Sequence, residues 1–214
     1  MTDAHQSAAG LTPAQTNALW RRLADAAPAG PAPVDAIPRR PARTDRIPLS
    51  FAQQRLWFLQ QLNPDSRAYH VIALLRLTGS LDPRLLAQSL EALQQRHEVL
   101  RTVFHEHQGQ PQQVVLDPEP VTLSLADLRP IPAAECERRV RQEARNEAAL
   151  PFDLARDRPW RLRLWRTGDE EYYLLVILHH LISDDWSVDI LLQELSECYA
   201  AGQQGRGPDW PPLP

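Results

Sequence analysis

The sequence predicts an α/β fold in which helices cover a mixed sheet as a two-layer sandwich. Apolar stretches with strand character alternate with stretches whose apolar residues recur at helical spacing. Capping patterns stand at the start of several of the helical stretches. The chain has 214 residues, 43% of them hydrophobic, which is enough for the core of one good-sized domain.

The first 48 residues are predicted to precede the folded domain, with residues 11–48 forming an arm. Within residues 1–26, Thr12, Pro13 and Gln15 supply a cap, a first-turn proline and a capping-box partner, so a short helix is expected there. Residues 27–48 contain six prolines, a composition typical of a semi-extended linker. The arm is expected to act as a spacer or as a docking element.

The folded domain is predicted to span residues 49–200, and its helices are marked by their first residues. Ser50 and Gln53 form a capping-box pattern. Asp82 can cap another helix, with Pro83 fitting its first turn. Caps or helical spacing of apolar residues predict four helices in this domain, at about 50–63, 82–96, 133–149 and 185–200.

The remaining apolar stretches of the domain are predicted to be strands. Residues 69–78 are apolar on both faces, so this strand should lie inside a covered sheet. Gln108-Gly109 and Gly168-Asp169 are each expected to turn a hairpin. The other strands are predicted at about 99–106, 112–116, 121–125, 161–167 and 171–179. Residues 201–214 are rich in Gly and Pro and are predicted to form an extended tail.

Composition narrows the possible functions. The net charge is −4, which argues against a general nucleic-acid or membrane-surface binder. All basic residues are Arg, and the absence of Lys excludes a lysine Schiff base and a P-loop lysine. The two cysteines, Cys136 and Cys198, fit buried thiols in a reducing compartment. With no apolar leader or membrane-length run, a cytoplasmic protein is expected.

The candidate functional segment follows the apolar run that ends at Leu178. It presents the pair His179 and His180 and, after a gap of three residues, Asp184 and Asp185. Because side chains alternate along a strand, one histidine should enter a cavity while the other packs inside. No third ligand stands at a suitable spacing, so no metal site is predicted. Two half-buried structural histidines are as good an interpretation as a catalytic histidine.

The acidic pair has a structural interpretation at the start of the last helix. Carboxylates there can cap free N–H groups and complement the helix dipole. Capping accounts for one acid, and the other needs a partner such as a buried arginine. Arg101 lies in an apolar stretch and is the expected partner of Asp184, with Arg96 as the alternative.

Several motifs together resemble the condensation domain of nonribosomal peptide synthetases. Residues 50–59 (SFAQQRLWFL) are similar to the family's first core motif, and residues 96–104 (RHEVLRTVF) are similar to its second. Residues 179–184 (HHLISD) resemble the start of the His-His-x-x-x-Asp-Gly signature, and residues 151–154 (PFDL) are also typical of the family. The resemblance covers about residues 47–214 and is strongest to the subclass that joins an L donor to an L acceptor. Starter-type domains, which use an acyl donor, are close in sequence.

The resemblance implies a chloramphenicol-acetyltransferase-like fold with two lobes around a tunnel. This chain would be the N-terminal, donor-side lobe, and the second lobe would be missing. The implied reaction forms an amide bond between substrates held on the phosphopantetheine arms of partner carrier proteins, so the chain itself would bind no cofactor. The catalytic residues would be His180, in the main role, and His179, while Asp184 would be structural. Asp185 stands where the family has Gly, which departs from the signature.

Two other hypotheses remain beside this one. The chain could be a non-catalytic lobe that binds carrier proteins or serves as a scaffold, which Asp185 and the missing half favour. It could also be an acyltransferase that works as a homo-oligomer in the manner of chloramphenicol acetyltransferase, using the same histidine and forming a trimer.

Overall fold

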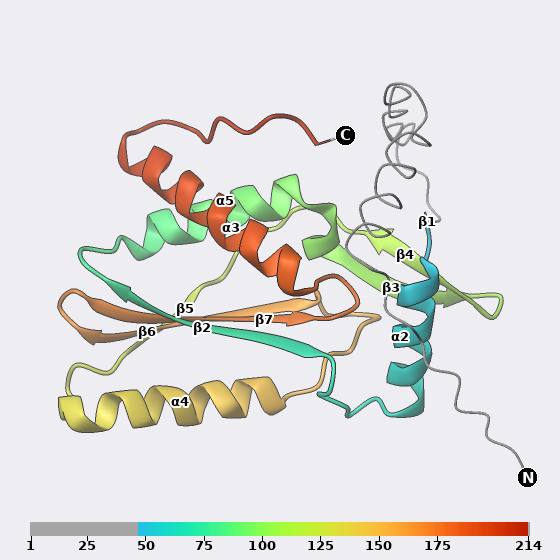
Figure 1. Cartoon of the computed structure of the whole chain (residues 1–214), viewed down its shortest axis with the longest axis horizontal. Coiled ribbons are helices and arrows are strands. Elements are labelled where there is room, and N and C mark those ends of the chain that lie inside the picture. Colours follow the sequence, from blue (N-terminus) through green and yellow to red (C-terminus); the bar gives the residue numbers. More distant parts are fainter. Residues whose placement is uncertain (1–46, 214) are drawn as a thin grey trace, which may run out of the picture. The chain divides into compact units, whose positions relative to one another are not determined.

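The computed structural model describes residues 47–213, and of these the side chain of Asp185 is not described. The predicted helix within residues 1–26, nearly all of the predicted linker and Pro214 lie outside the described residues. The described part contains two sheets and four α-helices (Figure 1). Among its helices, none is both long and apolar enough to cross a membrane.

The main sheet has four strands in the order β2-β7-β6-β5. The central strand β7 (Glu171–His179) pairs antiparallel with β2 (His70–Thr78) on one side and with β6 (Trp160–Gly168) on the other. The short strand β5 (Ser124–Asp127) runs parallel to β6, so the sheet is mixed, as predicted. Because β2 is an edge strand, one side of its backbone has no partner strand in the described part of the chain.

Helices cover both faces of this sheet (Figure 1). The helices α3 (Pro83–Arg96) and α5 (Asp185–Gln203) pack on one face, and α4 (Ala133–Ala149) packs on the other. Along β7, Leu174 and Val176 belong to the core under α3 and α5, whereas Leu175 and Ile177 belong to the core over α4. This alternation explains why β7 is apolar throughout. The α/β class is confirmed, with three layers here instead of the predicted two.

A smaller sheet and the helix α2 (Phe51–Leu62) stand beside the main sheet (Figure 1). The small sheet has the order β1-β4-β3, from β1 (Ile47–Pro48), β4 (Gln110–Val115) and β3 (Thr102–His107). The predicted turn at Gln108-Gly109 is confirmed. Both residues have positive φ, at 52° and 76°. Positive φ at both central residues is typical of two-residue hairpin loops whose twist matches the right-handed twist of the flanking strands.

The segment before β3 differs from the prediction. Residues Glu98–Arg101 form a 3₁₀ helix, η1, where the sequence pattern predicted a strand from residue 99. The Thr102 hydroxyl donates a hydrogen bond to the Glu98 carbonyl at 2.8 Å. This bond links residues four apart in sequence and favours a helical turn over an extended chain. The strand therefore begins only at Thr102.

The predicted helix starts are confirmed by their hydrogen bonds. Ser50 caps α2, and the side chain of Gln53 accepts a bond from the Ser50 backbone, which completes a capping box. Asp82 caps α3 by accepting bonds from the amides of Arg84 and Leu85, with Pro83 in the first turn.

Candidate functional site

The candidate site lies where β7 ends and the chain crosses to α5. His179 is the last residue of β7, and its side chain is completely buried, at 0% exposure. Its ring centre is 6.0 Å from that of Phe152, 6.1 Å from that of His70 and 6.4 Å from that of Tyr69. His179 is therefore part of the aromatic packing at this end of the sheet.

The hydrogen bonding of His179 defines a neutral ring. Its Nδ1 accepts a bond from the Leu181 backbone N–H at 3.1 Å, so the proton is on Nε2, which has no hydrogen-bond partner among the residues described. Burial, together with the positive charges that His70 and His180 can carry, lowers the pKa of His179 to about 4. At neutral pH this imidazole is uncharged and holds the backbone of the following loop.

His180 has the opposite environment, because its side chain is exposed. Its Nδ1 lies 2.5 Å from the Ser183 carbonyl oxygen. A carbonyl can only accept, so Nδ1 donates this bond and the neutral ring carries its lone pair on Nε2. Nε2 makes no hydrogen bond within the described residues, so it is free to accept a proton or a hydrogen bond from a substrate. As predicted, one histidine of the pair, His179, packs inside; the other, His180, is exposed and does not line the pocket described below.

The backbone around His180 is held on both sides. Its own amide donates to the Tyr69 carbonyl at 2.7 Å. The Ile182 amide donates to the His179 carbonyl at 3.0 Å, and the Ser183 hydroxyl donates to the same oxygen at 3.3 Å. A short loop with this many internal bonds positions the imidazole before any substrate arrives.

Asp184 is the N-cap of α5, as the structural interpretation predicted. Its Oδ1 accepts bonds from the Ser187 amide at 2.8 Å and from the Ser187 hydroxyl at 2.6 Å. These two bonds favour the charged carboxylate and lower the pKa of Asp184. Asp185 follows as the first residue of α5, and its side chain lies outside the described part.

The predicted ion pair between Asp184 and Arg101 is wrong. Arg101 donates from Nη1 to the Leu116 carbonyl at 2.5 Å, and its Nη2 lies 3.6 Å from Glu98 Oε1. Its partners are thus a neighbour in η1 and the end of the adjoining hairpin. Since Asp184 is already satisfied by its own helix, neither residue needs the other.

The alternative partner, Arg96, is also engaged elsewhere. Its Nε donates to Glu194 Oε1 at 2.9 Å, and His97 Nε2 lies 2.5 Å from the other oxygen of Glu194. The guanidinium stacks on the ring of Trp210 with its carbon 5.1 Å from the ring centre, and it donates to the Pro211 carbonyl at 2.8 Å. This group joins α3, α5 and the chain after α5. Sequence reasoning missed Glu194 and Trp210, which carry no motif of their own.

A small pocket adjoins the loop that carries His180. Its volume is about 150 Å³, and its wall is mostly apolar. Ser183, whose carbonyl accepts from His180, forms part of this wall, so the pocket lies beside the candidate site. The lining residues come from η1, the end of β7, the loop and α5: His97, Val99, Leu100, Leu178, Ile182, Ser183, Ser187, Ile190 and Leu191.

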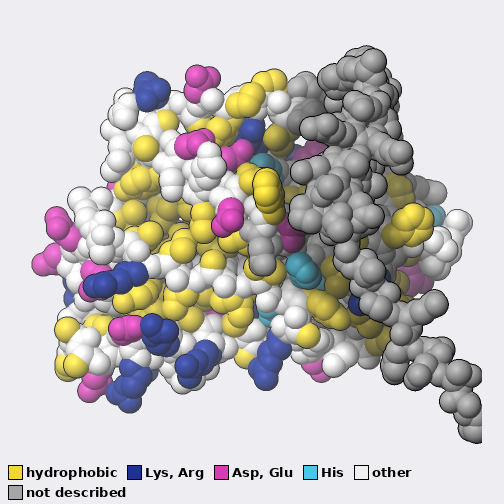
Figure 2. Space-filling model, in the orientation of Figure 1, with side chains coloured by type: hydrophobic (Ala, Val, Ile, Leu, Met, Phe, Trp, Pro, Cys, Tyr) yellow, Lys and Arg dark blue, Asp and Glu magenta, His cyan; other side chains and the backbone are white. Residues whose placement is uncertain are grey.

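A larger hollow runs beside the edge strand β2. It has a volume of about 570 Å³ and is lined mainly by leucines of β2, α3, β7 and α5, together with Tyr199. Figure 2 shows hydrophobic side chains gathered across the middle of this face, over β2 and below α5. Ile72 of β2 is 51% exposed. An open sheet edge beside an apolar hollow is a surface suited to being covered by further protein.

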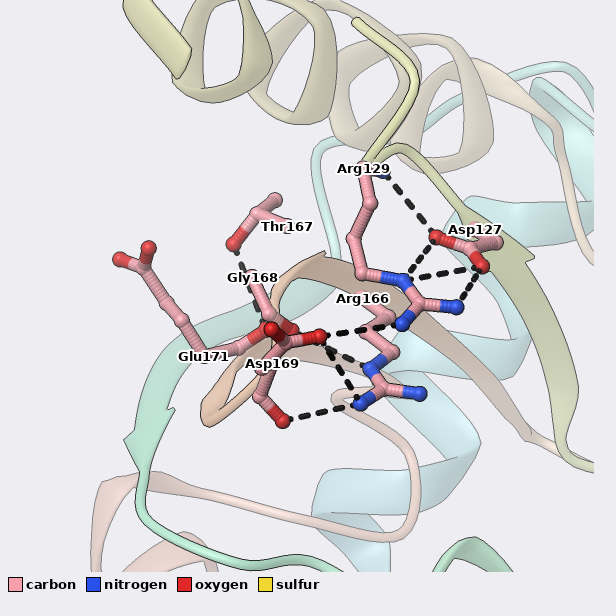
Figure 3. Close-up of polar contacts among 7 residues, drawn as sticks. All are labelled: Asp127, Arg129, Arg166, Thr167, Gly168, Asp169 and Glu171. Carbon is pink, nitrogen blue, oxygen red and sulfur yellow. Dashed lines mark hydrogen bonds and ion pairs between the residues drawn. The ribbon is translucent and has the colours of Figure 1, made fainter.

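The opposite end of the main sheet carries an ion network that is separate from the site. Figure 3 shows Arg129 between Asp127 and Asp169, with Arg166 reaching Asp169 from the same hairpin. Hydrogen bonds from Arg129 lower the pKa of Asp127 to about 2. The network links the end of β5 to the turn between β6 and β7, so its role is structural. Among the described residues, no cluster of three His, Cys, Asp or Glu side chains could hold a metal ion.

Comparison with protein families gives a match to the condensation domain over residues 43–214. The chain is 45% identical over 159 residues to the nonribosomal peptide synthetase kk1B of Curvularia clavata, covering 74% of this chain and 1% of that protein. It is 41% identical over 168 residues to the dimodular nonribosomal peptide synthase of Bacillus subtilis, covering 78% of this chain and 7% of that protein. The chain thus spans only a small part of the curated relatives it matches.

Solved structures give the same picture. The X-domain from teicoplanin biosynthesis, solved in complex with OxyB, is 32% identical with a TM-score of 0.72, over 83% of this chain and 38% of that chain. The first condensation domain of the calcium-dependent antibiotic synthetase has a TM-score of 0.73 over 79% of this chain and 41% of that chain. The latter is 24% identical, and this likeness shows the fold alone. The chain therefore spans well under half of both solved domains.

Proposed function

The chain belongs to the condensation-domain family of nonribosomal peptide synthetases, and from this premise we propose that it is the N-terminal, donor-side lobe of an amide-forming domain. In the proposed reaction, the amine of a carrier-bound aminoacyl group attacks an upstream carrier-bound acyl or peptidyl thioester. The observation that carries the proposal is the exposed His180 imidazole, held in one tautomer at the end of a rigid strand.

The reaction transfers one proton from the attacking amine to the leaving thiolate. As the amine nitrogen bonds to the thioester carbon, the carbon–sulfur bond breaks, and the proton lost by nitrogen ends on the leaving thiol. His180 Nε2 is the free lone pair that can accept this proton and pass it on. An α-amine has an ordinary pKa of about 7.7–8.0 and is partly neutral at pH 7, so hydrogen bonding and positioning by His180 can contribute as much as base catalysis.

His179 and Asp184 support this role without contacting the reacting atoms. His179 is buried and neutral, and it holds the loop after His180 through the Leu181 amide. Asp184 starts α5 and so fixes the far end of the same loop. In this proposal His180 is the catalytic residue, and the other two are positioning residues.

The proposed partners are carrier proteins and the remainder of the condensation domain. The substrates would arrive on the phosphopantetheine arms of the carriers, so this lobe would bind no cofactor of its own. The open edge of β2 and the apolar hollow beside it support a second lobe as a neighbour. The free, buried cysteines Cys136 and Cys198 are consistent with the proposed work in a reducing cytoplasm.

An amide-forming assay tests the proposal. The full-length protein is mixed with donor and acceptor carrier proteins that carry loaded phosphopantetheine, and product is measured by mass spectrometry. His180→Ala should lower the rate by about 100-fold or more, since general acid–base groups contribute on that scale. His107→Ala changes another exposed histidine, in the β3–β4 hairpin, and serves as the matched control. Equal product from the wild type and His180→Ala would overturn the catalytic role.

A second candidate function is a non-catalytic binding lobe. Two observations favour it: Asp185 replaces the glycine of the family signature, and the chain is 32% identical to an X-domain that forms a complex with OxyB. This alternative predicts carrier or enzyme binding that His180→Ala leaves unchanged, with no amide product. Amide product from the wild type would overturn this alternative. Asp185→Gly tests the first of the two observations, because gain of product in this variant would show that Asp185 limits catalysis in the native chain.

A further inference from the structure

Gln53 makes a hydrogen bond that its place in a capping box does not explain. Its Oε1 accepts from the Ser50 backbone N–H at 2.9 Å, which is the capping-box bond. Its Nε2 donates to the carbonyl of Leu181 at 3.2 Å, across 128 positions of sequence. Gln53 therefore joins the first turn of α2 directly to the loop that carries His180.

The orientation of the Gln53 amide is determined by its partners. The Ser50 N–H can only donate, so the amide oxygen of Gln53 must face it. The NH₂ group then faces the Leu181 carbonyl and the Oε1 of Gln113, which is 3.4 Å away. Gln113 uses its own NH₂ to donate to the Pro48 carbonyl at 3.0 Å, so its oxygen is left to accept. In this series of hydrogen bonds, each donor therefore faces an acceptor.

Leu181, the residue directly after His180, is held from two directions. Its N–H donates to the buried His179 ring, and its carbonyl accepts from Gln53. Its side chain is 3% exposed and packs in the core over α4. The peptide before His180 is fixed as well, because the His180 amide donates to the Tyr69 carbonyl. Gln53 thus ties the Leu181 carbonyl to an element outside the β7 loop.

We infer that Gln53 is a positioning residue for His180, which it serves by holding the Leu181 carbonyl from the first turn of α2. Without this bond, the peptide between Leu181 and Ile182 keeps only its hydrogen bond from the Ile182 N–H to the His179 carbonyl. The turn that presents the Ser183 carbonyl to the His180 ring is then less firmly held, and the ring loses its fixed direction. The kinetic consequence rests on the proposed function of His180, whereas the effect on the loop does not. The first core motif then contributes to the site through a side-chain amide and not only through packing.

The variant Gln53→Glu isolates this bond. A glutamate at the third helical position still accepts from the Ser50 N–H, so the capping box of α2 is kept. Its carboxylate cannot donate, so the bond to Leu181 is lost. Ser50→Ala is the matched control, because it removes the hydroxyl of the same cap and leaves the Gln53 amide in place.

Three measurements on the full-length protein follow the loop and the reaction. Hydrogen exchange of the Leu181 and Ile182 amides reports loop opening, and ¹⁵N NMR of the His180 imidazole reports its tautomer. Steady-state kinetics separate kcat from KM. For Gln53→Glu we expect exchange about tenfold faster or more, mixed tautomers, and kcat lowered by about 10- to 100-fold with KM nearly unchanged, as for a misplaced catalytic group. Ser50→Ala should leave the exchange rates and the tautomer as in the wild type.

An unchanged exchange rate and an unchanged His180 tautomer in Gln53→Glu would overturn the inference. Equal loop opening in Gln53→Glu and Ser50→Ala would overturn it as well, since the effect would then come from the helix cap. Should the wild type make no amide product, the proposed function fails while the exchange and NMR results still decide the role of Gln53. If Gln53→Glu does not fold, Gln53→Met is measured in its place. Methionine has a similar length but neither donates to Leu181 nor replaces the acceptor for the Ser50 N–H, so the expected result is loop opening greater than in Ser50→Ala, and equal opening would overturn the inference.

Discussion

Lowering the pH should destabilise the fold through one buried side chain, His179. In the unfolded chain this histidine binds a proton at its ordinary pKa of about 6.5, whereas in the folded protein its pKa is about 4. The unfolded state therefore takes up the proton first as the pH falls. The stabilisation is complete above about pH 6.5 and is lost progressively down to about pH 4.

The magnitude follows from the difference between the two pKa values. From 6.5 to about 4, at roughly 1.4 kcal/mol for each pKa unit, the full loss is about 3 kcal/mol. About 2 kcal/mol of this falls between pH 7 and pH 5. The groups that face the ring act in the same direction, since His70 on β2 and His180 in the loop both oppose a positive charge on it. The pKa of His70 is itself lowered by burial, so this residue adds to the loss.

Urea unfolding at a series of pH values between 7 and 5 measures the effect. The comparison is with His179→Gln, in which an amide oxygen can still accept from Leu181 but nothing titrates. The free energy of unfolding of the wild type should fall more steeply with decreasing pH, by about 2 kcal/mol over this range. Parallel curves for the two proteins would refute the reasoning. An NMR titration in which the His179 ring becomes protonated near pH 6.5 would refute it as well.

Three further predictions concern contacts outside the histidine pair. Asp184→Ala should lower the unfolding temperature by about 2–4 °C through loss of the α5 cap, while Asp184→Asn should change it little. A double-mutant cycle of Asp184→Ala with Arg101→Ala should give a coupling energy near zero, because the two residues do not pair. Arg129→Gln should cause a small loss of stability that disappears at high salt, and should leave the His180 ¹⁵N shifts unchanged, because the network is exposed and lies at the other end of the sheet. Trp210→Ala should increase the rate of tryptic cleavage after Arg206 about tenfold, since Trp210 stacks on Arg96 and donates to Glu197; an unchanged rate would show that the chain after α5 is held by other contacts.

The parts of the fold that sequence could predict are those with short-range causes. The capping box of Ser50 and Gln53 and the cap by Asp82 join residues two or three apart in sequence. The sequence pattern therefore names both partners of each hydrogen bond. The alternation along β7, which places successive side chains in the cores on its two faces, follows from strand pleating and needs only the apolar run to be predicted. His180 lies in the turn after β7, so its exposure follows from that turn and not from the pleat.

The parts that sequence could not predict depend on which of several partners is nearest in space. A buried arginine and an unassigned carboxylate suggested a pair between Arg101 and Asp184, yet each found a partner within a few residues or on an adjacent element. The second bond of Gln53 shows the same limit, because nothing near Gln53 in sequence indicates the Leu181 carbonyl. Long-range pairing follows from the packed geometry, and residue type alone leaves it open.

The position of Asp185 can be judged more closely with the backbone in view. A glycine, which the family signature has at this place, can adopt positive φ, a conformation that is costly for most other residues. Here Asp184 is the cap and Asp185 is the first residue of α5, a helical position that residues other than glycine adopt without strain. The backbone therefore gives no reason for glycine at this site. What remains is the bulk and charge that an aspartate brings to the segment after His180, and these are the properties that Asp185→Gly removes while the cap and the strand that hold His180 stay in place.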